Sequence, residues 1–287
     1  MSKVTVIGLG PMGAALARAL CGARHDVIVW NRSPGKAEPL VRLGTKAAGN
    51  IADAVTAAPV IVVCIDNYDS TRRLLETAEI APLLRGRTVV QFSTGTPAEA
   101  RAAETRMHAL GARYLDCAIM SYPERVGHAE TRILVAGATA AYEGCRRILE
   151  CLGGDLRYLG ENIAAAAAID LALLARGLAH RVGGIHAALL CQAEGVDVSV
   201  LASMFPGDVA LGDIFERIGA DRYDDPGATI TVWNAALTRI RQQAASAGMA
   251  GDVPDFIASL FDRAIAAGDG EQDVAALFKV LRGPARR

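Results

Sequence analysis

Three glycines near the start of the chain have the spacing of a phosphate-binding turn. They follow a short apolar run and open a stretch of helix-forming residues. Gly8 permits a tight turn, Gly10 lets backbone amides approach a pyrophosphate, and Gly13 lets the helix pack closely on the strand. The N-terminus of that helix faces the anion. The sequence therefore predicts a dinucleotide-binding turn made of Gly8, Leu9, Gly10, Pro11, Met12 and Gly13.

The residues after the second expected strand distinguish between two nucleotides. An NAD site usually ends this strand with a carboxylate that accepts hydrogen bonds from the ribose hydroxyls. This chain has Asn31, Arg32 and Ser33 there, and Lys36 follows. A guanidinium fork, a hydroxyl and an ammonium group suit a 2'-phosphate, which a carboxylate would repel. We therefore expect NADP(H) rather than NAD(H). The alternative is that Arg32 and Lys36 are ordinary solvated charges of a loop.

Two later strand ends are expected to approach the nicotinamide half of the cofactor. Ligands of open parallel sheets bind beyond the carboxyl ends of the strands. The segments that follow the next two expected strands are Ile65-Asp66-Asn67 and Ser93-Thr94-Gly95. The expected cofactor contacts from these segments are Ile65, Asn67, Ser93 and Thr94.

Asp170 is a lone carboxylic acid within an aliphatic run that extends from Ile163 to Ala175. Burial disfavours the charged form of a carboxyl group and so raises its pKa. A perturbed acid close to a nucleotide cleft is a candidate functional residue, although structural ion pairs give the same pattern. The alternatives are an ion pair with Arg176 or Arg181, or exposure to solvent.

The elements that would position these residues differ between the two parts of the chain. As far as about residue 160, short β-rich runs alternate with helical segments, which is typical of a parallel sheet wrapped by helices. The expected strands are Val4 to Gly8, Asp26 to Trp30, Val60 to Ile65, Thr88 to Phe92, Arg113 to Ala118 and Ile133 to Ala136, with helices such as Pro97 to Leu110 and Ala140 to Leu152 between them. The fold class is α/β, with an N-terminal doubly wound Rossmann sheet.

After Gly160 the pattern becomes almost wholly helical. Ile163 to Glu194 lacks proline and predicts one long helix or two closely joined ones, with the interdomain helix at about residues 163–190. Further helices are expected at Val198 to Phe205, Ala210 to Ala220, Ile230 to Ala247, Pro254 to Ala267 and Asp273 to Leu281. We expect a nucleotide-binding domain over residues 1–160 and an all-α substrate and dimerisation domain over residues 161–287. The long helix is apolar on most of its circumference, so a partner subunit is expected to cover it.

Bulk composition excludes several classes of protein. The chain has 287 residues, 52% of them hydrophobic, and a net charge of -1, with its basic residues spread along the length. Nothing in that balance favours a nucleic-acid partner. The six cysteines form no CxxC pair and the five histidines no i, i+4 pair, so we expect buried free thiols and no metal site. The apolar stretch at the N-terminus contains the glycine turn, so we do not expect it to be a signal peptide that is removed. No uncharged apolar run elsewhere reaches the length of a membrane span. We expect a cytoplasmic protein without membrane association.

Nearly the whole chain resembles the imine reductase and reductive aminase branch of the β-hydroxyacid dehydrogenase superfamily. The resemblance rests on the glycine turn, on Trp30-Asn31-Arg32-Ser33-Pro34-Gly35-Lys36-Ala37, on Gly95-Thr96-Pro97, on Asp170-Leu171-Ala172-Leu173-Leu174 and on the closing residues 273–282. It implies a homodimer with domain-swapped helices, in which one subunit's nucleotide domain and the other's helices share the cleft.

The residue types at the position of Asp170 distinguish members of this superfamily. Hydroxyacid dehydrogenases carry a lysine there and an asparagine four residues later, whereas this chain has Asp170 and Leu174. Their glycine-rich acid-binding segment is replaced here by residues 117–123. A carboxyl group cannot stabilise an alkoxide, but it can stabilise an iminium ion or protonate an imine nitrogen. The resemblance therefore implies hydride transfer from NADPH to the C=N bond of imines, cyclic ones in particular, with Asp170 as proton donor or iminium stabiliser.

Departures from the family pattern narrow this expectation. Reductive aminases have an asparagine where this chain has Thr94 and an aromatic hydroxyl where it has Leu178. Reduction of a preformed imine is therefore favoured over the joining of a ketone and an amine. Candidate pocket residues are Met120, Leu174, Leu178, Met204, Phe205, Leu211, Phe215 and Trp233; the alternative is that they are core, which is the more common role of apolar residues at helical spacing. Two other functions stay open: an alcohol or ketone oxidoreductase similar to the β-hydroxyacid dehydrogenases, and a catalytically weak NADPH-binding protein.

Overall fold

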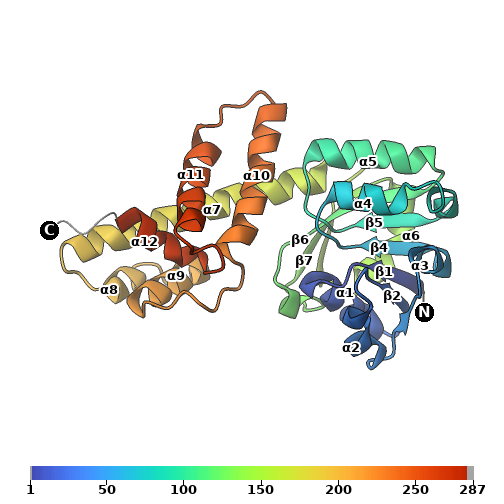
Figure 1. The fold of residues 1–287 in the computed structure, drawn as a ribbon, viewed down its shortest axis with the longest axis horizontal. Helices are drawn as coiled ribbons and strands as arrows, with labels where there is room; N and C mark the ends of the chain where they lie inside the picture. The colour runs from blue at the N-terminus through green and yellow to red at the C-terminus, as the bar shows by residue number, and fades with distance from the viewer. Residues whose placement is uncertain (1, 283–287) are drawn as a thin grey trace. The chain divides into compact units, whose positions relative to one another are not determined.

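The computed structural model describes residues 2–282 (Figure 1). The chain divides into two compact units, of which the first ends at Asp170 and the second begins at Leu171. The first unit contains the sheet and the second is helical. The fold class expected from the sequence, a Rossmann sheet followed by an all-α part, is confirmed.

The sheet of the first unit has eight strands in the order β3-β2-β1-β4-β5-β6-β7-β8. The strands are β1 (Lys3–Ile7), β2 (Asp26–Trp30), β3 (Lys46–Ala47), β4 (Val60–Val63), β5 (Thr88–Gln91), β6 (Arg113–Ile119), β7 (Arg132–Gly137) and β8 (Asp155–Tyr158). Strands β1 to β6 pair in parallel. Their order is that of a doubly wound dinucleotide-binding sheet. Successive strands are added on one side of β1 as far as β3 and on its other side from β4 onward, so the strand order reverses between β1 and β4.

Two features of the sheet differ from the expectation. The six expected strands are present, but β3 and β8 were not predicted, because β3 has only two residues, both exposed, and β8 is short and incompletely buried. The sheet is parallel, as expected, except between β6 and β7, which pair antiparallel. The chain between β6 and β7 holds only a three-residue 3-10 turn, Pro123–Arg125. Without a crossover helix the chain returns antiparallel.

Helices cover both faces of the sheet. One face packs against α1 (Pro11–Gly22), α2 (Glu38–Val41) and α6 (Thr139–Leu149), and the other against α3 (Ile51–Ala57), α4 (Tyr68–Leu75) and α5 (Pro97–Ala109). Side chains alternate between the two faces along each strand. In β4, for example, Val60 and Val62 join one core while Ile61 and Val63 join the other. A central strand buried on both faces explains why this run is uniformly apolar.

The long helix α7 (Ala165–Ala193) begins in the first unit and continues into the second. The second unit also contains α8 (Val198–Ala202), α9 (Val209–Gly219), α10 (Ile230–Ser246), α11 (Asp252–Ala266) and α12 (Leu277–Arg282). These helices share one apolar core. The expected helices are present, but α8 ends at Ala202, and the last one is divided into a 3-10 turn, Val274–Ala276, and α12.

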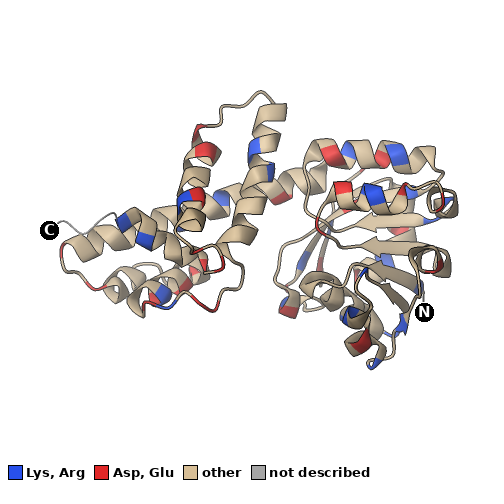
Figure 2. Ribbon diagram, in the orientation of Figure 1, with Lys and Arg blue, Asp and Glu red and all other residues tan. Residues whose placement is uncertain are grey.

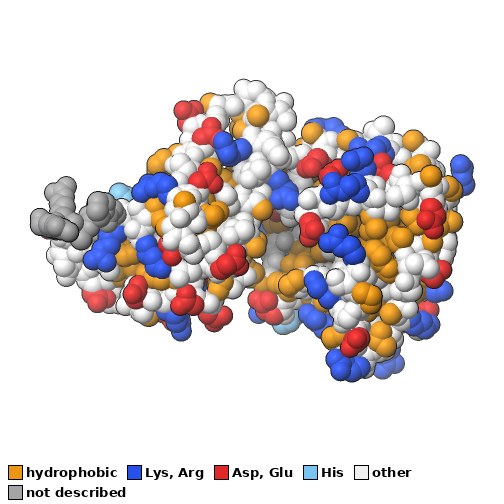
Figure 3. All heavy atoms as spheres, viewed as in Figure 1, with side chains coloured by type: hydrophobic (Ala, Val, Ile, Leu, Met, Phe, Trp, Pro, Cys, Tyr) orange, Lys and Arg blue, Asp and Glu red, His pale blue; other side chains and the backbone are white. Residues whose placement is uncertain are grey.

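Charged side chains of both signs are interspersed over both units (Figures 2 and 3). None of the described helices combines the length and apolar composition that a membrane span requires. All six cysteines are free thiols, of which Cys117 and Cys145 are buried and the other four are only partly buried, so the expectation of buried thiols holds fully for two of them.

Candidate cofactor and active site

A cleft of about 360 Å³ opens in the first unit at the carboxyl ends of β1, β2 and β4. This is the point at which the strand order reverses, where open α/β sheets bind their ligands. The residues that line the cleft are Gly8, Gly10, Trp30, Asn31, Arg32, Ser33, Lys36, Cys64, Ile65, Asp66, Ser70, Arg73 and Leu74.

Two glycines of the turn are required by the backbone itself. Gly8 has φ +93°, and a Cβ there would lie 2.2 Å from the carbonyl oxygen of Cys64. A Cβ on Gly13 would lie 2.0 Å from the carbonyl oxygen of Gly8. The Asn31 side chain braces the same turn, because its Oδ1 accepts a hydrogen bond of 3.0 Å from the backbone N–H of Leu9. The strand, turn and helix α1 therefore meet too closely for side chains at Gly8 and Gly13.

Gly10 differs from its two neighbours, because nothing in the protein lies within 4 Å of the position that its Cβ would occupy. It is the N-cap residue of α1 and lines the cleft. Gly10→Ala should therefore fold with an unchanged melting temperature yet bind NADPH about tenfold or more weakly, because the methyl group takes the room of a pyrophosphate. Fluorescence titration and thermal melts would measure both. Gly22→Ala, on the same helix and also without neighbours, is the control that should bind normally.

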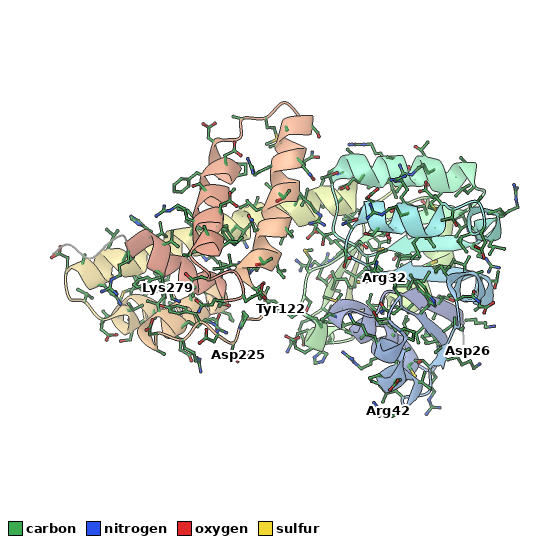
Figure 4. The ribbon with its side chains drawn as sticks, in the orientation of Figure 1. Asp26, Arg32, Arg42, Tyr122, Asp225 and Lys279 are labelled. Atoms are coloured by element: carbon green, nitrogen blue, oxygen red, sulfur yellow. The ribbon has the colours of Figure 1, made fainter. Side chains whose placement is uncertain are left out.

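The basic residues expected to hold a 2'-phosphate line the same cleft. Arg32, Ser33 and Lys36 are exposed and stand at its edge after β2, where Figure 4 labels Arg32. Within residues 2–282, Arg32 and Lys36 form no ion pair of 4.0 Å or less. Two cations and a hydroxyl at one edge of the cleft therefore fit a dianionic phosphate in donor type and charge.

Several cleft residues were not predicted. They are Trp30, Cys64, Ser70, Arg73 and Leu74, whereas Asp66 belongs to a segment that was expected on the cofactor side but was not itself named as a contact. Ser70, Arg73 and Leu74 belong to α4, which begins after the N-cap residue Asn67, whose side chain accepts a hydrogen bond from the Ser70 N–H. An asparagine, a favoured N-cap residue, at position 67 was the local signal for the start of this helix. Burial raises the pKa of the Cys64 thiol to about 12, so that it stays protonated.

Other predicted cofactor residues lie outside the lining of the cleft. They are Leu9, Pro11, Met12, Gly13, Asn67, Ser93 and Thr94. Ser93 is buried, and its Oγ accepts a hydrogen bond of 3.1 Å from the N–H of Ile65, which joins the two loops that follow β4 and β5. Contacts of these residues with a cofactor stay predictions.

Asp170 lies on α7 with 7% of its surface exposed. Its neighbours Ile169 and Leu173 are partly exposed aliphatic residues. A second buried acid was not predicted: Asp116, on β6, accepts a hydrogen bond from the hydroxyl of Tyr68. Burial raises the pKa of Asp116 to about 7, and the charge of Asp170 acts in the same direction. The charge of Asp170 therefore bears on the protonation of a second carboxyl group in the first unit.

The candidate pocket residues are divided between core and surface. Leu178, Leu211 and Phe215 are buried in the core of the second unit. Met204 and Phe205 are exposed, and Phe205 lies 6.2 Å from the Phe215 ring between centroids. Met120 and Leu174 are partly buried, and so is Trp233, whose ring lies 5.0 Å below the guanidinium carbon of Arg181. A role of these residues in a substrate pocket stays a prediction.

Comparison with known proteins matches both units. Residues 3–160 match the NAD binding domain of 6-phosphogluconate dehydrogenase, and residues 162–283 match the C-terminal domain described as NADPH-dependent reductive aminase-like. An NADPH-dependent reductive aminase from Aspergillus oryzae is 30% identical, with 98% of each chain covered.

Solved structures agree with these matches. An imine reductase from Myxococcus stipitatus in complex with NADP+ is 33% identical with a TM-score of 0.69, covering 97% of this chain and 99% of that one. A reductive aminase from Aspergillus terreus, solved with NADPH and ethyl-5-oxohexanoate, is 30% identical with a TM-score of 0.66, covering 98% of this chain and 100% of that one. The cleft, the two-unit architecture and full-length identity of about a third lead to one conclusion: the chain belongs to the imine reductase and reductive aminase family of oxidoreductases.

Proposed function

We propose that this protein is an NADPH-dependent imine reductase that reduces the C=N bond of imines, cyclic ones in particular. Relatives with NADP+ or NADPH bound support the cofactor, and Arg32 and Lys36 at the edge of the cleft support the 2'-phosphate. The observation that carries the reaction type is the buried carboxylic acid at Asp170. An acid suits a substrate that becomes a cation or accepts a proton, and it would oppose a developing alkoxide.

The roles of the residues follow from this proposal. The glycine turn holds the pyrophosphate, and Arg32, Ser33 and Lys36 hold the 2'-phosphate. When bound, NADPH supplies the hydride, and the protein supplies position and field. Asp170 donates its proton to the imine nitrogen or, as a carboxylate, stabilises the iminium ion. Nucleotide binding is assigned to residues 1–160, and substrate binding and dimerisation to residues 161–287.

Substrate comparison tests the reaction type. With NADPH, a small cyclic imine such as a pyrroline should be reduced, with NADPH absorbance lost and the amine detected by mass spectrometry. With NADP+, a hydroxyisobutyrate-like acid should give no turnover. Oxidation of the hydroxy acid without imine reduction would assign the chain to the alcohol and ketone oxidoreductases. NADPH binding without turnover of either substrate would leave a nucleotide-binding protein.

We also infer that the protein acts as a homodimer. Several large apolar side chains of the second unit are exposed in the single chain, among them Leu190, Met204, Val209, Val232 and Phe256. A soluble monomer rarely leaves so many apolar groups in water, and a second copy would cover them. Sedimentation equilibrium should give twice the chain mass, and a single-chain mass at micromolar concentration would contradict the inference.

A further inference from the structure

Two polar side chains stand side by side in the buried part of the sheet. Gln91, the last residue of β5, is paired in register with Asp116 of β6, and both are buried, with 0% and 1% of their surface exposed. Both point to the face covered by α3, α4 and α5, because Val89 and Tyr114, two residues before each, belong to the core on that face. A buried polar group is costly unless it is hydrogen-bonded, so each of the two requires a partner there.

Both partners come from α4. Nε2 of Gln91 donates a hydrogen bond of 2.9 Å to the hydroxyl of Thr71, and the hydroxyl of Tyr68 donates one to Oδ1 of Asp116. Thr71 in turn donates a bond of 3.3 Å to the carbonyl oxygen of Asn67, the N-cap residue of the helix. Hydrogen bonds are directional, so one bond to each of two neighbouring strands fixes the first turn of this short helix on the sheet.

Another face of α4 borders the cofactor cleft. The buried residues of the helix share one face and are Tyr68, Thr71 and Leu75. The residues that line the cleft share a different face and are Ser70, Arg73 and Leu74. Apolar packing has no direction, so the contacts of Leu75 alone would permit the helix to rotate or slide. The two bonds to the sheet therefore determine where the cleft face of α4 lies.

The ring of Tyr68 also contacts the loop after β5. It lies against Gly95, where a Cβ would be 2.3 Å from a ring carbon. Gly95 follows Ser93, whose Oγ accepts the hydrogen bond from the N–H of Ile65 that joins this loop to the loop after β4. The place of α4 therefore bears on both loops that follow the central strands.

We propose that Gln91 and Asp116 are positioning residues for cofactor binding, because their bonds to α4 hold its cleft face in place. This role rests on the proposed cofactor, NADPH, and needs no imine turnover. Neither side chain is among those that line the cleft, so both act through the helix. Loss of either bond should therefore weaken NADPH binding without removing any group that borders the cofactor.

Two conservative substitutions remove one bond each. Thr71→Val keeps the shape of the side chain and removes the hydroxyl that accepts from Gln91. Tyr68→Phe keeps the ring and removes the hydroxyl that donates to Asp116. We expect each variant to bind NADPH about fivefold more weakly in fluorescence titrations, because a misplaced helix loses part of the contribution of its cleft residues.

Thr5→Val is the matched control. Thr5 on β1 is also buried, and its hydroxyl donates a hydrogen bond of 2.8 Å to the carbonyl oxygen of Ala54. Ala54 belongs to α3, which contributes no residue to the described cleft. The control should lose about as much thermal stability as Thr71→Val and change NADPH affinity by less than about twofold.

A double-mutant cycle separates positioning from a general loss of stability. In a background without the two polar cleft groups of α4, made by Ser70→Ala and Arg73→Gln, Thr71→Val should change NADPH affinity by less than about twofold, because the groups that it would displace are already absent. A general loss of stability would weaken binding by the same factor in both backgrounds. Amide hydrogen exchange without cofactor gives a second readout: residues 71–75 should exchange about tenfold faster in Thr71→Val and in Tyr68→Phe, and at wild-type rates in Thr5→Val.

NADPH affinity within about twofold of the wild type in both Thr71→Val and Tyr68→Phe would overturn the proposal. An equal loss in Thr5→Val, or an undiminished effect of Thr71→Val in the background without the cleft groups, would do the same. If both variants fail to fold while Thr5→Val folds, the bonds support the whole fold and the proposal is wrong. A wild-type protein that binds no NADPH would contradict the proposed function instead, and the exchange rates of α4 would still decide whether the two bonds hold the helix.

Discussion

Replacing Arg32 with aspartate is expected to weaken NADPH binding by about 100-fold and to leave NADH binding within a few-fold. A hydrogen bond to a charged group contributes about 1.5–3 kcal/mol, and each 1.4 kcal/mol is tenfold in affinity. Arg32→Asp removes such bonds and adds repulsion of the 2'-phosphate. The same carboxylate can accept hydrogen bonds from the ribose hydroxyls of NADH, which lack that phosphate. The preference between the two cofactors should therefore narrow or reverse.

Arg42→Asp is the matched control for the loss of charge. Arg42 lies just after α2, at a shallow depression formed with Pro34 and Val41 and separate from the cofactor cleft. Figure 4 shows the two arginines well apart in the first unit. Both substitutions change the net charge by the same amount, so only Arg32→Asp should change the dissociation constant for NADPH in fluorescence titrations at fixed salt. An equal loss in both variants would mean that the effect is the overall field of the protein and that Arg32 does not contact the phosphate.

Arg73 is expected to contribute less than Arg32, although both line the cleft. Asp69 forms ion pairs with Arg73 and with Arg72 on the same helix. The carboxylate of Asp69 therefore offsets part of the positive charge of the two arginines on α4. The same contacts lower the pKa of the Asp69 carboxyl group. Arg32 and Lys36 thus remain the stronger source of attraction for a phosphate in this part of the protein.

The predictable parts of the fold are those in which the structure permits only a few residue types at neighbouring positions. Gly8 and Gly13 stand where a Cβ would collide with a carbonyl oxygen, and β4 is buried on both faces. Such positions restrict residue type strongly, so the sequence reveals them. The two exposed residues of β3, Lys46 and Ala47, carry no such restriction, since they are held by pairing with β2. Their structure arises from the neighbouring strand and leaves no local pattern.

The candidate site divides in the same way. Arg32, Ser33 and Lys36 follow a recognisable strand, and their place beside the glycine turn comes from the parallel pairing of β1 with β2. Asp116 gave no signal, because an isolated acid in a strand is usually one that points to solvent. It is buried because Tyr68 lies opposite, 48 residues away in the sequence. Burial of a polar group by a distant partner depends on tertiary packing, which local spacing does not encode.

Asp170→Asn is expected to reduce kcat/KM for a small cyclic imine by about 100-fold or more, with NADPH affinity changed less than twofold. General acid catalysis by a positioned side chain contributes about 10²–10⁴-fold. Asparagine has nearly the same size and can still orient a nitrogen by hydrogen bonding, but it cannot supply a carboxyl proton or a negative charge. Asp225→Asn is the control, because Asp225 is an exposed acid of the second unit and lies outside the described cleft.

Comparison of Asp170→Asn with Asp170→Ala distinguishes the two roles open to the acid. If Asp170 only orients the imine nitrogen through hydrogen bonds, the asparagine variant should keep most of the activity that the alanine variant loses. If Asp170 supplies the proton or the negative charge, both variants should lose activity to a similar extent. A preformed iminium substrate then separates these two roles, because it needs no proton: it should restore turnover if Asp170 is the proton donor and should not if Asp170 stabilises the iminium charge. Full activity in both variants, with the fold and NADPH binding intact, would remove Asp170 from the reaction. The reaction type would then have to be inferred from other groups, because the carboxylic acid is what favours C=N over C=O reduction.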